Sequence, residues 1–111
     1  MSTIFKKIID REIPADIVYE DEHCLAFRDI NPVAPVHLLV IPKKEIVNLG
    51  TMEAEDASVM GHCLSICKTV AELEGLEDFR VVTNSGAKAG QSVFHIHFHI
   101  IGGRALSWPP G

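Results

Sequence analysis

The pattern of apolar and polar positions predicts short helices and strands along this chain. Apolar residues recur at helical spacing over residues 4–9, and Ser2 or Thr3 can cap that helix. Two short apolar-rich segments, 17–20 and 24–28, follow with a polar turn between them. Short alternating segments joined by such a turn are typical of a β-hairpin. The first part of the chain is therefore expected to form a helix followed by a hairpin.

The middle of the chain predicts one buried strand and the longest helix. Residues 37–41 form a mostly apolar run, which Pro42 ends. The next periodic segment predicts a helix over 52–73, with Thr51 as N-cap and Gly75 as stop signal. The three-four spacing predicts that its buried face comprises Met60, Cys63, Leu64, Cys67, Val70 and Ala71.

Three histidines alternate with large apolar residues near the end of the chain. We expect strands over 79–83 and 92–101, and the second contains His95, His97 and His99. Side chains on a strand point alternately to opposite faces, so the three imidazoles should share one face. The residues expected to enter the core between them are Ile96, Phe98 and Ile100.

The spacing of these histidines limits their chemistry. Same-face neighbours on a strand lie roughly 7 Å apart and the outer pair roughly 13 Å apart, so one zinc ion cannot bind all three. A zinc site would need ligands from elsewhere, and the sequence contains no complete ligand pattern. An extended phosphate ester fits the row better, because imidazole can act as nucleophile, hydrogen-bond donor or general acid near neutral pH. The isolated His23 and His62 are in no recognisable arrangement.

Composition narrows the class of protein. The 111 residues with 47% hydrophobic content suffice for one domain, and the net charge of −5 argues against a general nucleic-acid surface. Three cysteines form no disulfide framework; Cys63 and Cys67 are read as buried thiols in preference to metal ligands of His62, since their spacing matches no zinc pattern. The sequence contains no signal-peptide pattern and no membrane-length apolar run, so a cytoplasmic protein is expected.

Several segments together resemble the histidine triad superfamily. Segment 95–101 (HIHFHII) resembles its signature, and segments 27–32 (FRDINP) and 34–44 (APVHLLVIPKK) resemble its first strands. The ending 108–111 (WPPG) resembles the histidine triad nucleotide-binding protein branch. This resemblance implies an α+β fold with a five-stranded antiparallel sheet and two helices, as a single domain over 1–111. It also implies a homodimer, with tail 105–111 at the dimer interface and near the partner's site.

The resemblance also assigns catalytic roles. His97 corresponds to the nucleophile that attacks the α-phosphorus and forms a nucleotidylated intermediate. His95 and His37 would orient or support it. His99 and Ser92 would contact phosphate oxygens and the leaving-group nitrogen, and whether His99 delivers the proton is left open.

A nucleotide pocket is inferred in the same way. Its base end would be apolar, Asp29 would accept the ribose hydroxyls, and the remaining contacts would come from the loop and tail. The corresponding residues are Phe5, Ile8, Phe27, Ile30, Asn84, Gly90, Gln91, Ser92, His97, His99 and Trp108. The apolar members can equally be core, and Asp29 can equally cap a turn. In loop 84–91 the glycines suit an ordinary turn, or an anion site made by the amides of Gly90 to Ser92.

The function expected from this resemblance is hydrolysis of purine nucleoside 5′-phosphoramidates, with no cofactor and no metal. A dinucleoside polyphosphate hydrolase is the nearest enzymatic alternative, although that branch lacks the 108–111 ending. A nucleotide-binding module that acts through protein partners is an alternative of another class. A zinc protein built on the histidines is the third.

Overall fold

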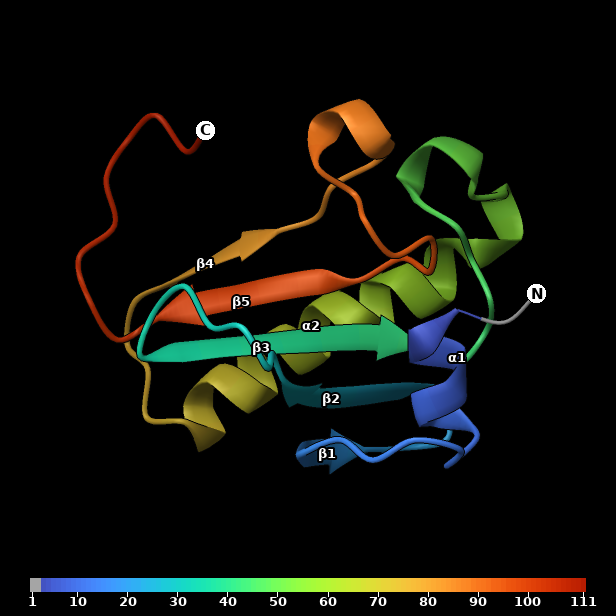
Figure 1. The fold of residues 1–111 in the computed structure, drawn as a ribbon, viewed down its shortest axis with the longest axis horizontal. Helices are drawn as coiled ribbons and strands as arrows, with labels where there is room; N and C mark the ends of the chain where they lie inside the picture. The colour runs from blue at the N-terminus through green and yellow to red at the C-terminus, as the bar shows by residue number, and fades with distance from the viewer. Residues whose placement is uncertain (1–2) are drawn as a thin grey trace.

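The fold is an antiparallel sheet with a helix on each face. The structure, a computed structural model, describes residues 3–111, so the alternative cap Ser2 lies outside the described residues. The five strands are hydrogen-bonded in the order β1-β2-β3-β5-β4, and each neighbouring pair is antiparallel (Figure 1). The elements are α1 (Ile4–Ile9), β1 (Ile17–Glu20), β2 (Cys24–Arg28), β3 (Val36–Pro42), α2 (Ala57–Leu73), β4 (Phe79–Val82) and β5 (Phe98–Gly102). The expected α+β fold is confirmed.

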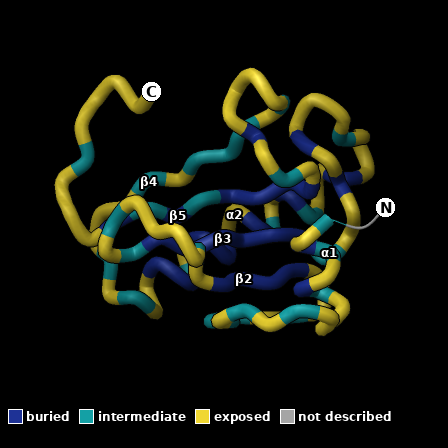
Figure 2. Tube along the Cα trace, viewed as in Figure 1, coloured by how far each residue is buried: buried dark blue, intermediate teal, exposed yellow. Residues whose placement is uncertain are grey.

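One face of the sheet packs against α2 and forms the larger core. The central strands β2, β3 and β5 are the most deeply buried part of the sheet (Figure 2). From these strands, Ala26, Val40 and Ile100 pack against helix residues such as Cys67 and Val70. Burial of this apolar surface is the main source of stability, at about 25 cal/mol per Å² removed from water.

The opposite face packs against α1 and carries the site. Phe5 and Ile8 of α1 form a second apolar cluster with Phe27 of β2 and Leu39 of β3. Thr3 caps this short helix, because its hydroxyl accepts a hydrogen bond from the amide of Lys6 at 3.2 Å. Since α1 is short, it covers only part of this face, at the end of β3 (Figure 1).

The long helix begins later than its periodicity predicts. Thr51 does not cap it; Leu49–Thr51 and Ala54–Asp56 form 3₁₀ turns, and α2 begins at Ala57. The reason is local capping, because Asn48 accepts from the amide of Thr51 at 3.1 Å and Asp56 accepts from that of Glu53 at 2.9 Å. The predicted stop at Gly75 is confirmed by its positive φ of 72°.

The prediction of the buried helix face is wrong for one residue. Leu64 is 52% exposed, whereas Ile66 is buried. These two residues flank opposite edges of the stripe centred on Cys67, and the sheet covers only the Ile66 edge. Periodicity fixes the centre of a buried stripe better than its edges. The thiols of Cys24, Cys63 and Cys67 are free and buried, which confirms packing as the role of Cys63 and Cys67.

The last strand is shorter than predicted. Regular pairing begins at Phe98, opposite Val40 of β3, so Ser92 to His97 precede β5 rather than forming part of it. The neighbouring strands end here, because β4 stops at Val82 and Pro42 has no amide hydrogen to continue the ladder. The alternation nevertheless persists: Ile96, Phe98 and Ile100 all lie in the α2-side core.

Candidate active site

His97 is fixed by the backbone of the segment that precedes β5. Its Nδ1 lies 2.8 Å from the carbonyl oxygen of His95, and only a protonated nitrogen can donate to that acceptor. The lone pair of neutral His97 is therefore on Nε2. The ring is buried and meets the edge of Phe5, with ring centroids 4.9 Å apart. The described structure thus presents one imidazole with a defined tautomer beside α1.

His37 and His99 form a second unit whose proton positions are also defined. His37 lies at the start of β3, and its Nδ1 accepts a hydrogen bond from the amide of Val33 at 3.2 Å. Neutral His37 must then carry its proton on Nε2, which lies 2.9 Å from Nδ1 of His99. Because Nδ1 of His99 is the acceptor, the proton of neutral His99 is on Nε2. The ring centroids of His97 and His99 are 5.0 Å apart.

Burial keeps the imidazoles of His97 and His99 neutral. It is the main cause of the lowered pKa of His97, and it opposes the hydrogen bond to the carbonyl of His95. Burial, followed by the proximity of His97 and His37, lowers the pKa of His99 to about 4. At neutral pH the site therefore combines a lone pair on one ring with an N–H on the next.

His95 is the least accessible of the three alternating histidines. It is 1% exposed, and its Nε2 donates to the carbonyl oxygen of Pro42 at 2.8 Å. Its side chain thus anchors the 92–97 segment to the end of β3, while its carbonyl holds His97. Sequence reasoning missed the backbone partners at Val33 and Pro42, because carbonyl and amide groups carry no residue-type signal.

The predicted nucleoside residues fall into two groups. Phe5, Ile8 and Phe27 are buried in the α1-side cluster, next to the histidines through the Phe5–His97 contact. Ile30, by contrast, is 88% exposed. The structure brings the first three together and leaves Ile30 outside their cluster.

Asp29 is placed to serve both roles considered for it, the turn cap and the acceptor of the ribose hydroxyls. Its Oδ1 accepts from the amide of Asn31 at 2.8 Å, so it does cap the turn after β2. Its Oδ2 lies 3.4 Å from Nε2 of His37, beside the hydrogen-bonded pair of His37 and His99. Capping therefore occupies one carboxylate oxygen and leaves the other facing the histidines.

Loop 84–91 is held by Gln91, whose side chain uses all of its hydrogen-bonding capacity internally. Its amide donates to the carbonyls of Val47 and Val93, and its oxygen accepts from the side chain of Asn48 and the amide of Gly86. This arrangement contradicts a direct side-chain contact between Gln91 and a nucleotide, because all its polar positions are already satisfied. Gln91 is 3% exposed.

The same loop limits which backbone amides of Gly90 to Ser92 are available to bind an anion. The amide of Gly90 donates to Ala87 at 3.0 Å and that of Gln91 to Gly86 at 3.1 Å, so neither is available to an anion. The reason is the 3₁₀ turn Ala87–Ala89, which consumes these donors as it closes. Ser92 is exposed and follows the turn directly. Asn84 is half-buried, with its side chain next to Gly90.

The C-terminal tail lies away from the histidines of its own chain. It leaves the end of β5 opposite to the 92–97 segment (Figure 1). Trp108 is 80% exposed and stacks near Arg80 of β4, whose guanidinium carbon is 6.0 Å from the ring centroid. Arg80 also donates to the carbonyl of Ser107 at 2.9 Å. The structure thus separates Trp108 from the other predicted site residues within one chain.

Two clusters in the described residues have metal-ligand character. Asp29, His37 and His99 place one ligand atom each within 4.8 Å of one another, and so do Asp21, Cys24 and His62. In the first set the His37–His99 hydrogen bond already uses the two nitrogens. The second set was missed at the sequence level, because Asp21 and His62 lie far apart in the chain and match no local spacing pattern.

Comparison with known proteins identifies the family. A family model described as the HIT domain matches residues 10–106. An uncharacterized HIT-like protein of Synechococcus elongatus is 59% identical over 98% of this chain and 96% of its own length. A 14 kDa zinc-binding protein of Zea mays is 54% identical over 98% of this chain and 88% of its own length. The crystal structure of a HIT family hydrolase from Legionella pneumophila has a TM-score of 0.96 at 46% identity, covering 99% of this chain and 100% of that one. These matches confirm the resemblance carried by residues 95–101, and the chain belongs to the HIT family.

Proposed function

We propose that this protein is a hydrolase that cleaves purine nucleoside 5′-phosphoramidates to nucleoside monophosphate and amine. The observation that carries the proposal is the pair of defined tautomers: a lone pair on Nε2 of His97 beside an N–H on Nε2 of His99. Such a pair suits nucleophilic attack on phosphorus with stabilisation of the departing group. Solved relatives that carry the name HIT family hydrolase support the coarser assignment.

In the first step, Nε2 of His97 attacks the α-phosphorus. A bond forms between that nitrogen and phosphorus, and the phosphorus–nitrogen bond of the substrate breaks. The positive charge that develops on the His97 ring is stabilised through Nδ1, which donates to the carbonyl of His95 at 2.8 Å. Water then attacks the phosphorus, releases the nucleotide, restores His97 and gives up a proton.

The leaving nitrogen must take up a proton as its bond to phosphorus breaks, and the water of the second step gives one up, so the two steps together leave the protonation of the protein unchanged. His99 is the group proposed to face it, since its Nε2–H adjoins His97 and its Nδ1 is supported by His37. Ser92 would add a hydroxyl donor to a phosphate oxygen. His95 and His37 act as positioning residues, through the carbonyl that holds His97 and the ring that holds His99.

The nucleoside would lie on the α1 side of the sheet. Phe5, Ile8 and Phe27 supply apolar surface there, and Asp29 has one carboxylate oxygen beside His37 for the ribose hydroxyls. Asn84 and Gly90 would border the phosphate end. Ile30 can contribute only at the rim, because it is 88% exposed.

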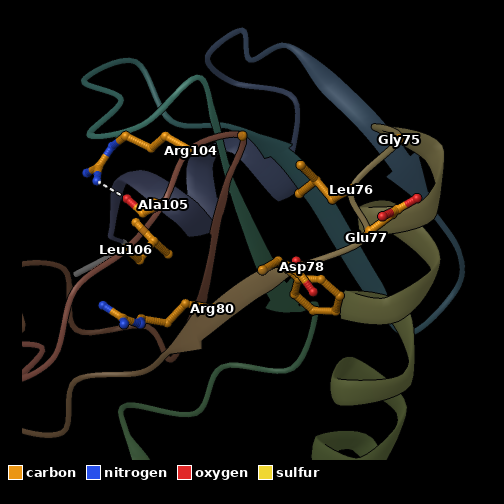
Figure 3. A pocket seen from close by; sticks show the side chains of 10 residues that line it. Gly75, Leu76, Glu77, Asp78, Arg80, Arg104, Ala105 and Leu106 are labelled. Atoms are coloured by element: carbon orange, nitrogen blue, oxygen red, sulfur yellow. Dashed lines mark hydrogen bonds between the residues drawn. The ribbon is translucent and has the colours of Figure 1, made fainter.

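We also propose that the protein is a cytoplasmic homodimer in which the tail 105–111 reaches the partner's site. Trp108 is free to do so, and edge strand β4 presents Phe79 and Val81 to the outside. A cavity of about 660 Å³ between the end of α2 and the tail adds apolar surface to this side, from Leu76 and Leu106 (Figure 3). Sedimentation at micromolar concentration should give the dimer mass; a monomer would contradict this part of the proposal. Among residues 3–111, none of the helices has the length and apolar character to cross a membrane.

The decisive experiment is hydrolysis of an adenosine 5′-phosphoramidate in excess chelator. We expect release of AMP, a loss of at least about 10³-fold in His97→Ala, and retained nucleotide binding. His23→Ala is the matched control, because His23 is exposed and outside this site. Protein quenched in alkaline denaturant, which preserves phosphorus–nitrogen bonds, should carry a covalent nucleotidyl group that the His97 variant lacks.

Other outcomes favour the alternatives. Faster cleavage of diadenosine polyphosphates than of phosphoramidates would identify a dinucleoside polyphosphate hydrolase. Nucleotide binding without turnover of either substrate would identify a binding module that acts through partners. Activity that the chelator abolishes would identify a metal at the Asp29, His37 and His99 set.

A further inference from the structure

A second cluster of chemically active side chains lies on the other face of the sheet. It joins the β1–β2 hairpin to α2 through Asp21, Cys24 and His62, whose ligand atoms lie within 4.8 Å of one another. Cys24 packs in the α2-side core, whereas His97 contacts Phe5 on the α1 side. The cluster is therefore separate from the proposed active site and has no part in the proposed reaction.

Asp21 is held in a fixed orientation by its own hairpin. Its Oδ1 accepts from the amides of His23 and Cys24, both at 2.8 Å, and its Oδ2 accepts from the hydroxyl of Tyr19 at 2.8 Å. Burial alone would raise the pKa of Asp21, but the hydrogen bonds from His23, His62 and Tyr19 outweigh it and hold that pKa well below its usual range. The carboxylate is therefore ionised and oriented, as a metal ligand supported by outer hydrogen bonds would be.

His62 approaches Asp21 from α2. Its Nε2 lies 2.6 Å from Oδ2 of Asp21. Zinc binds nitrogen and oxygen at about 2.0–2.2 Å and sulfur at about 2.3 Å, which places tetrahedral ligand atoms roughly 3.3–3.8 Å apart. The Asp21–His62 contact would have to open by about 1 Å, and the sulfur of Cys24 is already within the 4.8 Å limit. The movement has to come from the His62 side chain, because the hydrogen bonds of the hairpin hold Asp21.

A fourth donor and an entrance lie beside these three. His23 and His62 line a cleft of about 380 Å³, together with Glu55 and Asp56. The rings of His23 and His62 have centroids 5.5 Å apart. The side chain of His23 is 59% exposed, so it is free to turn toward an ion. The cleft thus opens His23 and His62 to solvent, and the two acidic groups on its wall, Glu55 and Asp56, are paired with Lys44, which lines the same cleft.

We propose that Asp21, Cys24 and His62 form a zinc site, with His23 as the fourth ligand. One carboxylate, one thiolate and imidazole nitrogens are the mixed donor set that suits this borderline-soft ion. Binding replaces the Asp21–His62 hydrogen bond with two metal bonds, and the proton of His62 moves to Nδ1. The thiol of Cys24 loses its proton to solvent, so one proton is released per ion bound.

The test is titration of the whole protein with zinc by calorimetry, and with cobalt by absorption. Unaltered protein should bind one ion at this site, and the cobalt form should give a thiolate-to-metal charge-transfer band. His62→Gln can still donate to Asp21 but should lose the ion. His23→Gln should weaken binding by about 10–100-fold. Cys24→Ser should remove the charge-transfer band, whereas Cys67→Ala, the matched buried thiol, should keep it.

Two further variants separate this site from the active site and from misfolding. His99→Gln removes a ligand of the other candidate set and should leave the cobalt band in place. The double variant His23→Gln with His62→Gln keeps Cys24 and the core, so it tests the site even where Cys24→Ser unfolds. Unchanged zinc binding in that double variant, or a cobalt spectrum without a thiolate band, overturns the proposal. His62→Gln should keep phosphoramidate turnover. The metal titration and the turnover assay therefore test the zinc site and the proposed function separately.

Discussion

Nε2 of His37 lies 2.9 Å from Nδ1 of His99, and the amide of Val33 occupies the opposite nitrogen of His37. The two rings are thereby joined into one hydrogen-bonded unit. A proton added to Nδ1 of His99 would face the N–H of His37, so this contact opposes protonation of His99. Burial also lowers the pKa of His99, so both effects favour its neutral form near neutral pH.

The first prediction concerns the pH dependence of kcat/KM, which reports groups of the free enzyme. Burial and the neighbouring histidines lower the pKa of His99 from 6.5 to about 4, so activity that needs its neutral form should persist well below pH 6.5. We expect the acid limb of the profile to fall near pH 4 in the unaltered protein. A limb near pH 6.5 would contradict the lowered pKa of His99.

The same shifts predict the direction of the pH dependence of stability. Burial lowers the pKa values of His95, His97 and His99 in the folded state, so the unfolded chain binds more protons below pH 6.5. Their contribution is fully present above pH 6.5 and is lost as the pH falls below that value, down to about 4 for His99. The free energy of unfolding, measured in denaturant across this range, should decrease with acid. Stability that rises as the pH falls from 6.5 to 4 would contradict it.

The second prediction removes the partner of His99. In His37→Phe the proximity of His37 no longer depresses the pKa of His99, so the acid limb of kcat/KM should move upward. We expect kcat to fall by about 10–100-fold, because His99 loses the contact that fixes its tautomer. His23→Phe is the matched control and should leave both values unchanged. A lower kcat with an unmoved limb would indicate a purely structural role for His37.

The third prediction concerns Gln91. In Gln91→Glu a carboxylate would face the carbonyls of Val47 and Val93, which now accept from the side-chain amide at 2.7 and 3.1 Å. We expect loss of about 2–4 kcal/mol of unfolding free energy, because buried acceptors lose their donors and repel the new charge. Asn84→Asp, in the same loop but half-buried, should cost much less. Equal costs, measured by chemical denaturation, would contradict the anchoring role of Gln91.

Local periodicity was sufficient to predict most of the fold. Thr3 as a cap, the hairpin of β1 and β2, and Gly75 as a stop depend on neighbouring residues, which the sequence displays directly. The start of β5 could not be predicted, because strand pairing ends where neighbouring strands end. Pro42 closes the ladder on one side, and its effect on residues 92–97 appears only when β3 and β5 are adjacent.

The residue types of the site could be predicted from the sequence, but most of their hydrogen-bond partners could not. Alternation placed His97 and His99 on the face opposite to Phe98 and Ile100, and the structure agrees. What fixes the tautomers, however, is backbone: the carbonyl of His95 and the amide of Val33. Residue identity does not encode such contacts. The sequence also did not reveal that the side chain of Gln91 makes all of its hydrogen bonds within the protein, since its partners come from distant loops.

The fourth prediction concerns Gly90, which has a φ of 104°. Gly90→Val forces a branched side chain into this left-handed conformation and should reshape the loop that precedes Ser92. We expect phosphoramidate turnover to fall much more than folding stability does. Gly75→Val is the matched control, because Gly75 has a φ of 72° at the end of α2, away from the histidines. A folded Gly90 variant with unaltered kinetics would remove this loop from the site.

The fifth prediction separates the two roles of Asp29. One oxygen caps the turn through the amide of Asn31 at 2.8 Å, and the other lies 3.4 Å from Nε2 of His37, where the ribose hydroxyls are proposed to bind. Asp29→Ala removes both, so it should lose about 1 kcal/mol of unfolding free energy and the preference for ribonucleotides over 2′-deoxyribonucleotides.

Asp29→Asn keeps an oxygen for the cap but replaces the second acceptor with a donor. We therefore expect it to retain the stability of the unaltered protein and still lose most of the ribose preference, measured as the ratio of kcat/KM for the two substrates. An unchanged ratio in both variants, with stability lost only in Asp29→Ala, would assign Asp29 to the turn alone. Asp29→Ala thus reports on both carboxylate oxygens and Asp29→Asn on the second alone, which is why the pair is more informative than Asp29→Ala by itself.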